Sequence, residues 1–314
     1  MSNNENNSLN FSSFDGENIE DIMKQKESEP IPKKQSVGVL KNKKSLIFTV
    51  CVTLILALLL VFTLLMINKA NSDDGSDSDL KDEVIYTTDN FEYKTNLSDE
   101  VKGALNTTDK DYLVLVNKSN PLGEAYIPSN LKKLDSSICT KDSELQGAAA
   151  IAADALVREM WACGFADIRV TSAYRSYARQ NQLFESYISN EIEKKPSLSR
   201  DEAKKIVLGY SAEAGYSEHQ SGLCVDFINI MKMIDLCNYG SETTNNPYDL
   251  GFAEIPEYEW LLENAHKFGF ILRYPDDKTN VTGYNYESWH YRFVGVDAAT
   301  KIHNEGITLE EYLK

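Results

Sequence analysis

The 314-residue sequence contains four histidines, and two of them stand among other side chains that could do chemistry. His219 is followed seven residues later by Asp226, and His290 is preceded by Glu287 at a spacing of three. A catalytic zinc ion takes three protein ligands and leaves a fourth position for water, whose pKa then falls to about 7. Two histidines and one aspartate meet that requirement.

Hydrolysis at such a centre needs a further carboxylate that does not bind the metal. It takes the water's proton and delivers it to the leaving amine, so it must lie within hydrogen-bond reach of both. Glu287 is placed for that task, although spacing alone is a weak signal and a lone histidine is more often structural. Cys224 is a competing fourth ligand because it shares a strand face with Asp226, but a fourth protein ligand would close the open position.

Secondary-structure signals indicate how these side chains are positioned. Capping boxes begin at Ser143 and Ser199, Pro256 opens a helix, and Gly164 and Gly269 end helices. The expected strands are 112–116, 168–171, 222–227, 270–274 and 290–294, and the expected helices are 148–163, one after Arg175, one after Ser199 and one from Pro256. Their irregular alternation predicts an α+β domain with a small, mostly antiparallel sheet flanked by helices.

One segment near the N-terminus has a different character. Residues 46–67 form a 22-residue run without a charge, which as a helix would span about 33 Å, enough for a bilayer core. We therefore predict a transmembrane helix over 45–67. Five lysines precede it and two follow closely, at positions 33, 34, 41, 43 and 44, and at 69 and 81. This bias predicts a cytoplasmic N-terminus and an extracellular catalytic domain.

The rest of the chain divides around this span. Residues 1–44 are polar and predicted to be a disordered cytosolic tail, 68–83 an acidic linker, and 84–314 a single extracytoplasmic domain. The formal net charge of −16 argues against nucleic acid as a partner. Cysteines of an outer domain can form disulfides, and the sequence-local choice among three possibilities pairs Cys139 with Cys163 and Cys224 with Cys237.

Several motifs occur in an order that strongly resembles the VanY-type D-alanyl-D-alanine carboxypeptidases. They are Ser172-Ala173-Tyr174-Arg175-Ser176, then Gln180, then Ser217-Glu218-His219 through Asp226, and Glu287-Ser288-Trp289-His290-Tyr291-Arg292. The resemblance extends from about residue 112 to the C-terminal end. One departure is Ser288, where the family usually has proline, which affects local rigidity but not the flanking residues.

The resemblance implies one zinc ion bound by His219, Asp226 and His290, with Glu287 as general base and acid. Arg175 would face the peptide carbonyl or the terminal carboxylate, and two further residues, Gln180 and Ser217, would line the substrate cleft.

The implied function is a membrane-anchored, monomeric carboxypeptidase that removes the C-terminal D-alanine from peptidoglycan stem peptides. Because the family also contains LD-carboxypeptidases, action on tetrapeptide stems is an alternative. A non-catalytic peptidoglycan-binding or sensor module with a structural zinc is another. The remaining histidines, His266 and His303, match no metal position and are expected to be structural.

Overall fold

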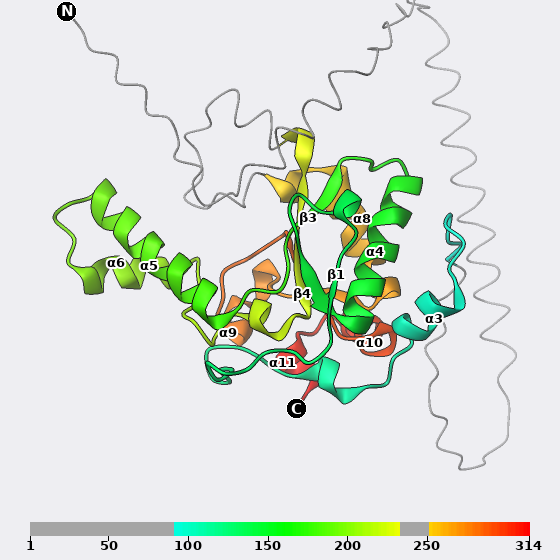
Figure 1. Cartoon of the computed structure of the whole chain (residues 1–314), viewed down its shortest axis with the longest axis horizontal. Coiled ribbons are helices and arrows are strands. Elements are labelled where there is room, and N and C mark those ends of the chain that lie inside the picture. The colour runs from blue at the N-terminus through cyan, green and yellow to red at the C-terminus, as the bar shows by residue number, and fades with distance from the viewer. Residues whose placement is uncertain (1–90, 233–250) are drawn as a thin grey trace, which may run out of the picture. The chain divides into compact units, whose positions relative to one another are not determined.

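A four-stranded antiparallel sheet forms the centre of the fold in the computed structural model, which describes residues 91–232 and 251–314 (Figure 1). The strands lie in the order β3-β4-β6-β5. They comprise β3 (Ile168–Ser172), β4 (Cys224–Asn229), β5 (Phe270–Leu272) and β6 (His290–Phe293). The sequence-predicted α+β class with a small antiparallel sheet is confirmed.

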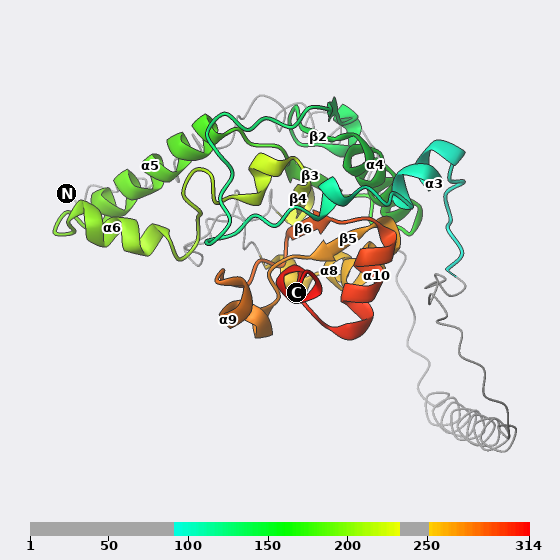
Figure 2. The ribbon, with the colours of Figure 1, turned by 90° about the horizontal axis from the view of Figure 1, so that it is seen from below.

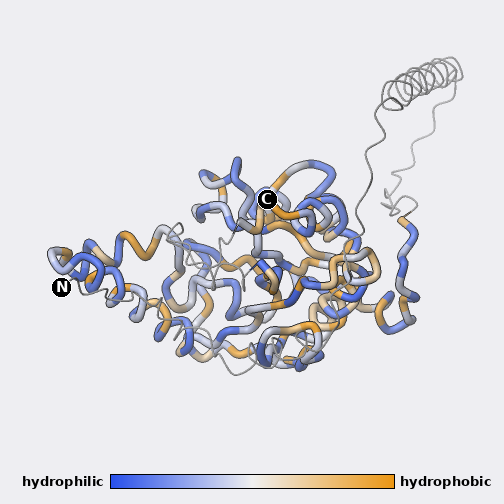
Figure 3. Tube along the Cα trace, turned by 90° about the horizontal axis from the view of Figure 1, so that it is seen from above, coloured by the Kyte–Doolittle hydropathy of each residue, from blue (hydrophilic) through white to orange (hydrophobic). Residues whose placement is uncertain are grey.

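The two faces of this sheet differ in chemistry because side chains alternate along each strand. One face carries Val225, Phe227, Tyr291 and Phe293, which belong to the same buried cluster as the alanine-rich helix α4 (Gly147–Ala162). The other face carries polar side chains of β4 and β6. Figure 3 shows hydrophobic stretches running through the interior, while much of the periphery is hydrophilic.

A two-stranded sheet, β1 (Leu131–Lys133) and β2 (Glu144–Gln146), leads directly into α4. The capping box predicted at Ser143 is not formed. The Gln146 side chain instead donates a hydrogen bond to the carbonyl of Ser221, 2.8 Å away, and α4 starts without a side-chain cap. The predicted helix is therefore right in its position and wrong in how it begins.

The strand predicted over 112–116 is also wrong. Lys110–Leu113 form the 3-10 helix η1, capped by Asp109, and the residues after it pair with no strand. The reason is a long-range contact, since the carbonyls of Tyr112 and Val114 accept hydrogen bonds from the buried guanidinium of Arg292 at 2.9 and 2.7 Å. The apolar residues of this segment predicted a strand, but two of its backbone carbonyls accept hydrogen bonds from the Arg292 side chain and none pairs with a neighbouring strand.

Helices α5 (Tyr177–Lys194) and α6 (Arg200–Val207) form a hairpin that projects from the body of the domain (Figures 1 and 2). Ser199 and Glu202 form the predicted capping box of α6. The hairpin has a small apolar cluster of its own, built around Phe184 and Ile188 of α5. It therefore packs largely on itself.

The remaining elements surround the sheet. They are α3 (Asp99–Leu105), η2 (Ser136–Ile138), η3 (Glu218–Ser221), η4 (Phe252–Glu254), α8 (Pro256–Asn264), η5 (Ala265–Phe268), η6 (Asp276–Lys278), α9 (Thr279–Thr282), α10 (Val296–Glu305) and α11 (Leu309–Tyr312). Pro256 opens α8 as predicted, and Gly269, at φ +77°, ends η5. A Cβ at Gly269 would lie 2.7 Å from the Phe293 ring, so this turn requires glycine.

Three of the cysteines are described, and all are free thiols. Cys139 is buried beside β3, and Cys163 caps the C-terminal end of α4, so the predicted Cys139–Cys163 disulfide is wrong. Local sequence order placed them together, but the two residues belong to separate elements with separate packing. Cys224 is not bonded to a second cysteine either, and Cys237 lies outside the described residues.

The predicted tail 1–44, transmembrane helix 45–67 and linker 68–83 also lie outside the described residues, as does the start of the predicted outer domain up to residue 90. Among the helices that the structure does describe, none has the length and apolar character needed to cross a bilayer.

Candidate metal centre and active site

The two central strands and one short turn bring the candidate metal ligands together. In the β4–β6 register Asp226 lies opposite His290, so both side chains share the polar face of the sheet. His219 lies in η3, and Gly222, at φ +66°, turns the chain from η3 into β4. All three side chains are buried, at 3–5% exposure.

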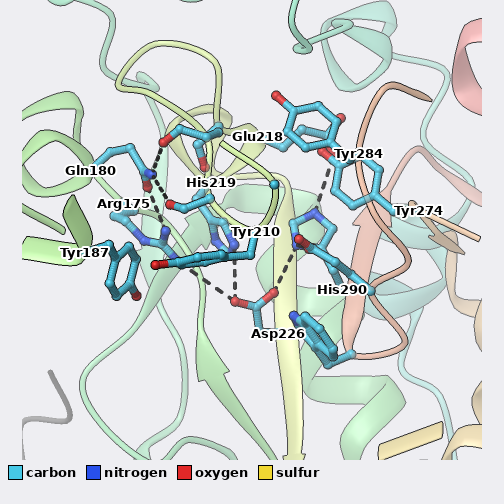
Figure 4. Close-up of a pocket in the computed structure, with 16 residues that line it drawn as sticks. Arg175, Gln180, Tyr187, Tyr210, Glu218, His219, Asp226, Tyr274, Tyr284 and His290 are labelled. Atoms are coloured by element: carbon cyan, nitrogen blue, oxygen red, sulfur yellow. Dashed lines mark hydrogen bonds and ion pairs between the residues drawn. The ribbon is translucent and has the colours of Figure 1, made fainter. Parts of the chain in front are cut away.

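Asp226 lies between the two histidines (Figure 4). Its Oδ2 is 3.2 Å from Nε2 of His219, and its Oδ1 is 3.0 Å from Nδ1 of His290. Zinc bonds of 2.0–2.1 Å in a tetrahedral site give ligand separations of about 3.3 Å. Each histidine nitrogen therefore lies at about the separation from Asp226 that two ligands of one zinc ion have.

The second nitrogen of each imidazole also has a fitting neighbour. Nδ1 of His219 donates to the carbonyl of Ala173 at 2.7 Å, and Nε2 of His290 lies 3.5 Å from Oε2 of Glu218, an ion-pair separation without a hydrogen bond. A ligating histidine in proteins commonly has a carbonyl or carboxylate beside its other nitrogen, which fixes its tautomer. The lone pairs of His219 Nε2 and His290 Nδ1 are thereby directed towards Asp226.

Glu218 is itself held by two arginines. Its Oε1 accepts hydrogen bonds from Arg273 Nε at 2.8 Å and Arg292 Nη1 at 2.7 Å, and all three side chains have no exposed surface. Burial alone would raise the pKa of Glu218, but the two guanidinium groups bring it well below its usual range. Arg273 continues the network to Glu310 of α11 at 2.6 and 2.8 Å.

Charge at the centre favours a cation. Despite burial, Asp226 raises the pKa of His219 to about 9, and the pKa of His290 is also raised. The negative potential that holds protons on these rings also attracts a divalent ion, whose binding releases them. Glu287 is an acid, so burial, which disfavours its charged form, raises its pKa to about 7. Its Oε2 lies 3.7 Å from His290 Nδ1, so a second carboxylate adjoins the three candidate ligands.

The structure brings every sequence-predicted site residue into one pocket, shown in Figure 4. Its lining includes Arg175, Gln180, Ser217, His219, Asp226, Glu287 and His290. Arg175 donates to Gln180 Oε1 at 2.7 Å and to Ser172 Oγ at 2.9 Å, and its Nη2 is 3.9 Å from Asp226 Oδ2. Gln180, only 1% exposed, also donates to the carbonyl of Ala212, so its amide holds Arg175 in place.

Sequence reasoning missed the aromatic walls of this pocket. Tyr187 and Tyr210 come from the α5–α6 hairpin and its end, and Tyr274 and Tyr284 come from the opposite side (Figure 4). Tyr274 stacks on His290 with ring centroids 5.0 Å apart. No local motif marks these tyrosines, because only the fold places them beside the histidines.

His266 and His303 lie outside this pocket, stacked on each other with ring centroids 4.0 Å apart. Their direct contact is consistent with the structural role expected for both.

Two buried histidines, an aspartate between them and a neighbouring glutamate at a pocket are the kinds of side chain that mononuclear zinc hydrolases use. A family model described as VanY, D-alanyl-D-alanine carboxypeptidase, matches residues 142–296. A D-alanyl-D-alanine carboxypeptidase of Enterococcus faecalis is 37% identical over 64% of this chain and 65% of its own length. The bifunctional D-Ala-D-Ala dipeptidase and carboxypeptidase VanXYC of Enterococcus gallinarum is 31% identical over 64% of this chain and 92% of its own.

Solved structures agree with these relatives. A mutant of the vancomycin-resistance D,D-pentapeptidase VanY, in complex with Zn(II), is 33% identical with a TM-score of 0.50, covering 65% of this chain and 99% of that one. The LD-carboxypeptidase LdcB is 30% identical with a TM-score of 0.50, covering 66% and 88%. The chain belongs to the VanY family of D-alanyl-D-alanine carboxypeptidases. It spans just under two thirds of the length of the Enterococcus faecalis relative.

Proposed function

We propose that this protein is a zinc carboxypeptidase that removes the C-terminal D-alanine from peptidoglycan stem peptides. The observation that carries the proposal is the placement of a free carboxylate, Glu287, beside a His219–Asp226–His290 trio whose separations of 3.0 and 3.2 Å suit zinc. The carboxypeptidase names of the relatives and the Zn(II) complex of the VanY mutant support the same conclusion.

In this proposal His219 Nε2, an oxygen of Asp226 and His290 Nδ1 hold the ion. Zinc at such a site supplies a Lewis acid that makes a water nucleophilic near neutral pH. Glu287 accepts the proton from the attacking water and gives it to the amine nitrogen as the C–N bond breaks. Its raised pKa, about 7 through burial, matches a group that must both take and release a proton.

Arg175 supplies the positive charge of the pocket. Its side chain is 17% exposed, and the contacts of its guanidinium with Gln180 and Ser172 fix the plane of that group. A planar, permanently charged fork suits the carboxylate at the peptide's C-terminus or the developing oxyanion at its carbonyl. Ser217 also lines the pocket, and its hydroxyl can bond the peptide backbone.

Defined muropeptides test this proposal. The full chain, purified in mild detergent, is incubated with pentapeptide and tetrapeptide stems, with zinc and after chelation, and released D-alanine is measured by mass spectrometry. Release from the pentapeptide that requires zinc is expected. Zinc-dependent release from the tetrapeptide alone would replace the proposal with LD-carboxypeptidase activity, which the similarity to LdcB favours as the second candidate. No release from either would refute both.

We further propose that the domain acts outside the cell as a monomer, tethered by a helix over 45–67. The 22-residue uncharged run and the lysine bias before it support this proposal. Protease added to intact cells is expected to remove the catalytic domain while sparing an epitope at the N-terminus. Cleavage of the N-terminal epitope on intact cells would overturn the orientation.

A further inference from the structure

Cys224 is a buried thiol next to the metal centre that the proposed mechanism does not use. It is the first residue of β4, has no exposed surface, and lies two residues before Asp226 on the same face of the strand. Its Sγ, one ring nitrogen of His219 and one ring nitrogen of His290 all lie within 4.8 Å of one another.

The direction from which this sulfur approaches is as informative as its distance. The pocket is lined by His219, Asp226 and His290, but Cys224 is not among its lining residues. Cys224 pairs across the sheet with Arg292, next to the Asp226–His290 pair. The thiol therefore reaches the centre from the floor formed by β4 and β6, while the substrate side stays open.

Sulfur at this position has a defined chemistry. A cysteine thiolate is among the preferred ligands of zinc, with a bond of about 2.3 Å, and thiolate and imidazole ligands occur together in catalytic zinc sites. A soft sulfur donor also favours zinc, cobalt or cadmium over magnesium or manganese, which prefer oxygen. A structural role as a small apolar side chain would not require two imidazole nitrogens around the sulfur.

We propose that Cys224 is a ligand of the metal ion in the resting enzyme, together with His219 and His290. The inference rests on the proposed function in so far as that function places zinc at these histidines. A fourth protein donor would not close the site, because catalytic zinc can expand to five ligands and the substrate side of this centre stays open. Cys224 would therefore add to His219, Asp226 and His290 and would replace none of them.

Cobalt spectroscopy tests the inference without using activity. The metal-free full chain is titrated with one equivalent of Co²⁺, and a near-ultraviolet sulfur-to-cobalt charge-transfer band is expected. Cys224→Ala should lose that band while keeping the visible d–d bands that show cobalt bound. Cys139→Ala, which removes another buried thiol, is the matched control and should keep both. Asp226→Ala should keep the charge-transfer band.

Zinc affinity gives a second readout. Competition with a chromogenic chelator should show that Cys224→Ala and the nearly isosteric Cys224→Ser weaken zinc binding about 10-fold or more, because removing even an outer-shell partner costs that much. Bound cobalt without a charge-transfer band in the wild type would overturn the role of Cys224 and leave the proposed function intact. Failure of the wild type to bind cobalt or zinc at all would overturn both.

Discussion

Glu218 links the metal centre to the stability of the domain, and Glu218→Gln separates these two effects. The substitution preserves shape but removes the charge that compensates Arg273 and Arg292, both of which are fully buried. Removing one partner of a buried ion pair costs about 3–5 kcal/mol. For a domain of this size each kcal/mol corresponds to about 2–4 °C, so the melting temperature of the metal-free protein should fall by about 6–20 °C.

The same substitution should also weaken zinc binding. An amide at 3.5 Å from His290 Nε2 lacks the negative charge that orients and polarises the imidazole. The loss expected for such an outer-shell partner is about 10–100-fold in zinc affinity, measured by chelator competition at a temperature where the variant is folded.

Glu310→Gln is the matched control for Glu218→Gln. It removes the negative charge and one of the two oxygens that accept from Arg273 at 2.6 and 2.8 Å, and Glu310 has no hydrogen bond to His290. It should lower the melting temperature, by less because Glu310 is partly exposed at 9%, and leave zinc affinity unchanged. If Glu218→Gln bound zinc as tightly as Glu310→Gln, Glu218 would serve folding alone and our reasoning about His290 would be refuted.

Three further outcomes are expected. Glu287→Gln should keep zinc and lower turnover about 10²–10⁴-fold, and wild-type turnover in this variant would contradict the mechanism. In the wild type, kcat/KM should fall as the pH drops below the Glu287 pKa of about 7, because the general base must be ionised. Arg175→Lys should raise KM more than Gln180→Ala does, since lysine cannot form the planar fork, and steady-state kinetics on defined peptides decide this. Burial, aided by the neighbouring His303 and Lys267, lowers the pKa of His266 to about 4 in the folded protein. As the pH drops from about 6.5 towards 4, the unfolded chain is protonated at this residue before the folded one, so the stability of the fold should decrease. His266→Gln should reduce the difference between the melting temperatures at pH 7 and pH 5, and an unchanged difference would contradict this role of His266.

Helix boundaries that depend on neighbouring residues could be predicted from the sequence. The Ser199–Glu202 capping box, Pro256 and Gly269 act within one helical turn, so the sequence predicts their effects directly. The strand predicted over 112–116 failed for the opposite reason, because Arg292, about 180 residues away, takes its backbone carbonyls. The Cys139–Cys163 pairing failed because proximity in sequence did not bring the two thiols together.

In the candidate site, too, residues within local motifs could be predicted, whereas roles that depend on distant residues could not. Residue types and spacing pointed to the two histidines, Asp226 and Glu287, and the resemblance to the VanY-type carboxypeptidases added Arg175, Gln180 and Ser217. The structure gathers all seven into one pocket. Glu218 was visible beside His219, yet its role depends on Arg273 and Arg292, which lie 55 and 74 residues further along the chain. A glutamate buried between two arginines carries no signature in its own neighbourhood, so its part in the centre emerged only from the fold.

The projecting α5–α6 hairpin combines a core of its own with a share in the pocket wall. Its cluster of Phe184, Ile188, Ala203 and Val207 is separate from the main core, while Tyr187 and Tyr210 from the same hairpin help to line the pocket. Changes in hairpin length or composition can therefore remodel one wall of the pocket without disturbing the strands that hold the metal ligands. Substitutions within the hairpin are therefore a direct route to altered peptide selectivity in this protein.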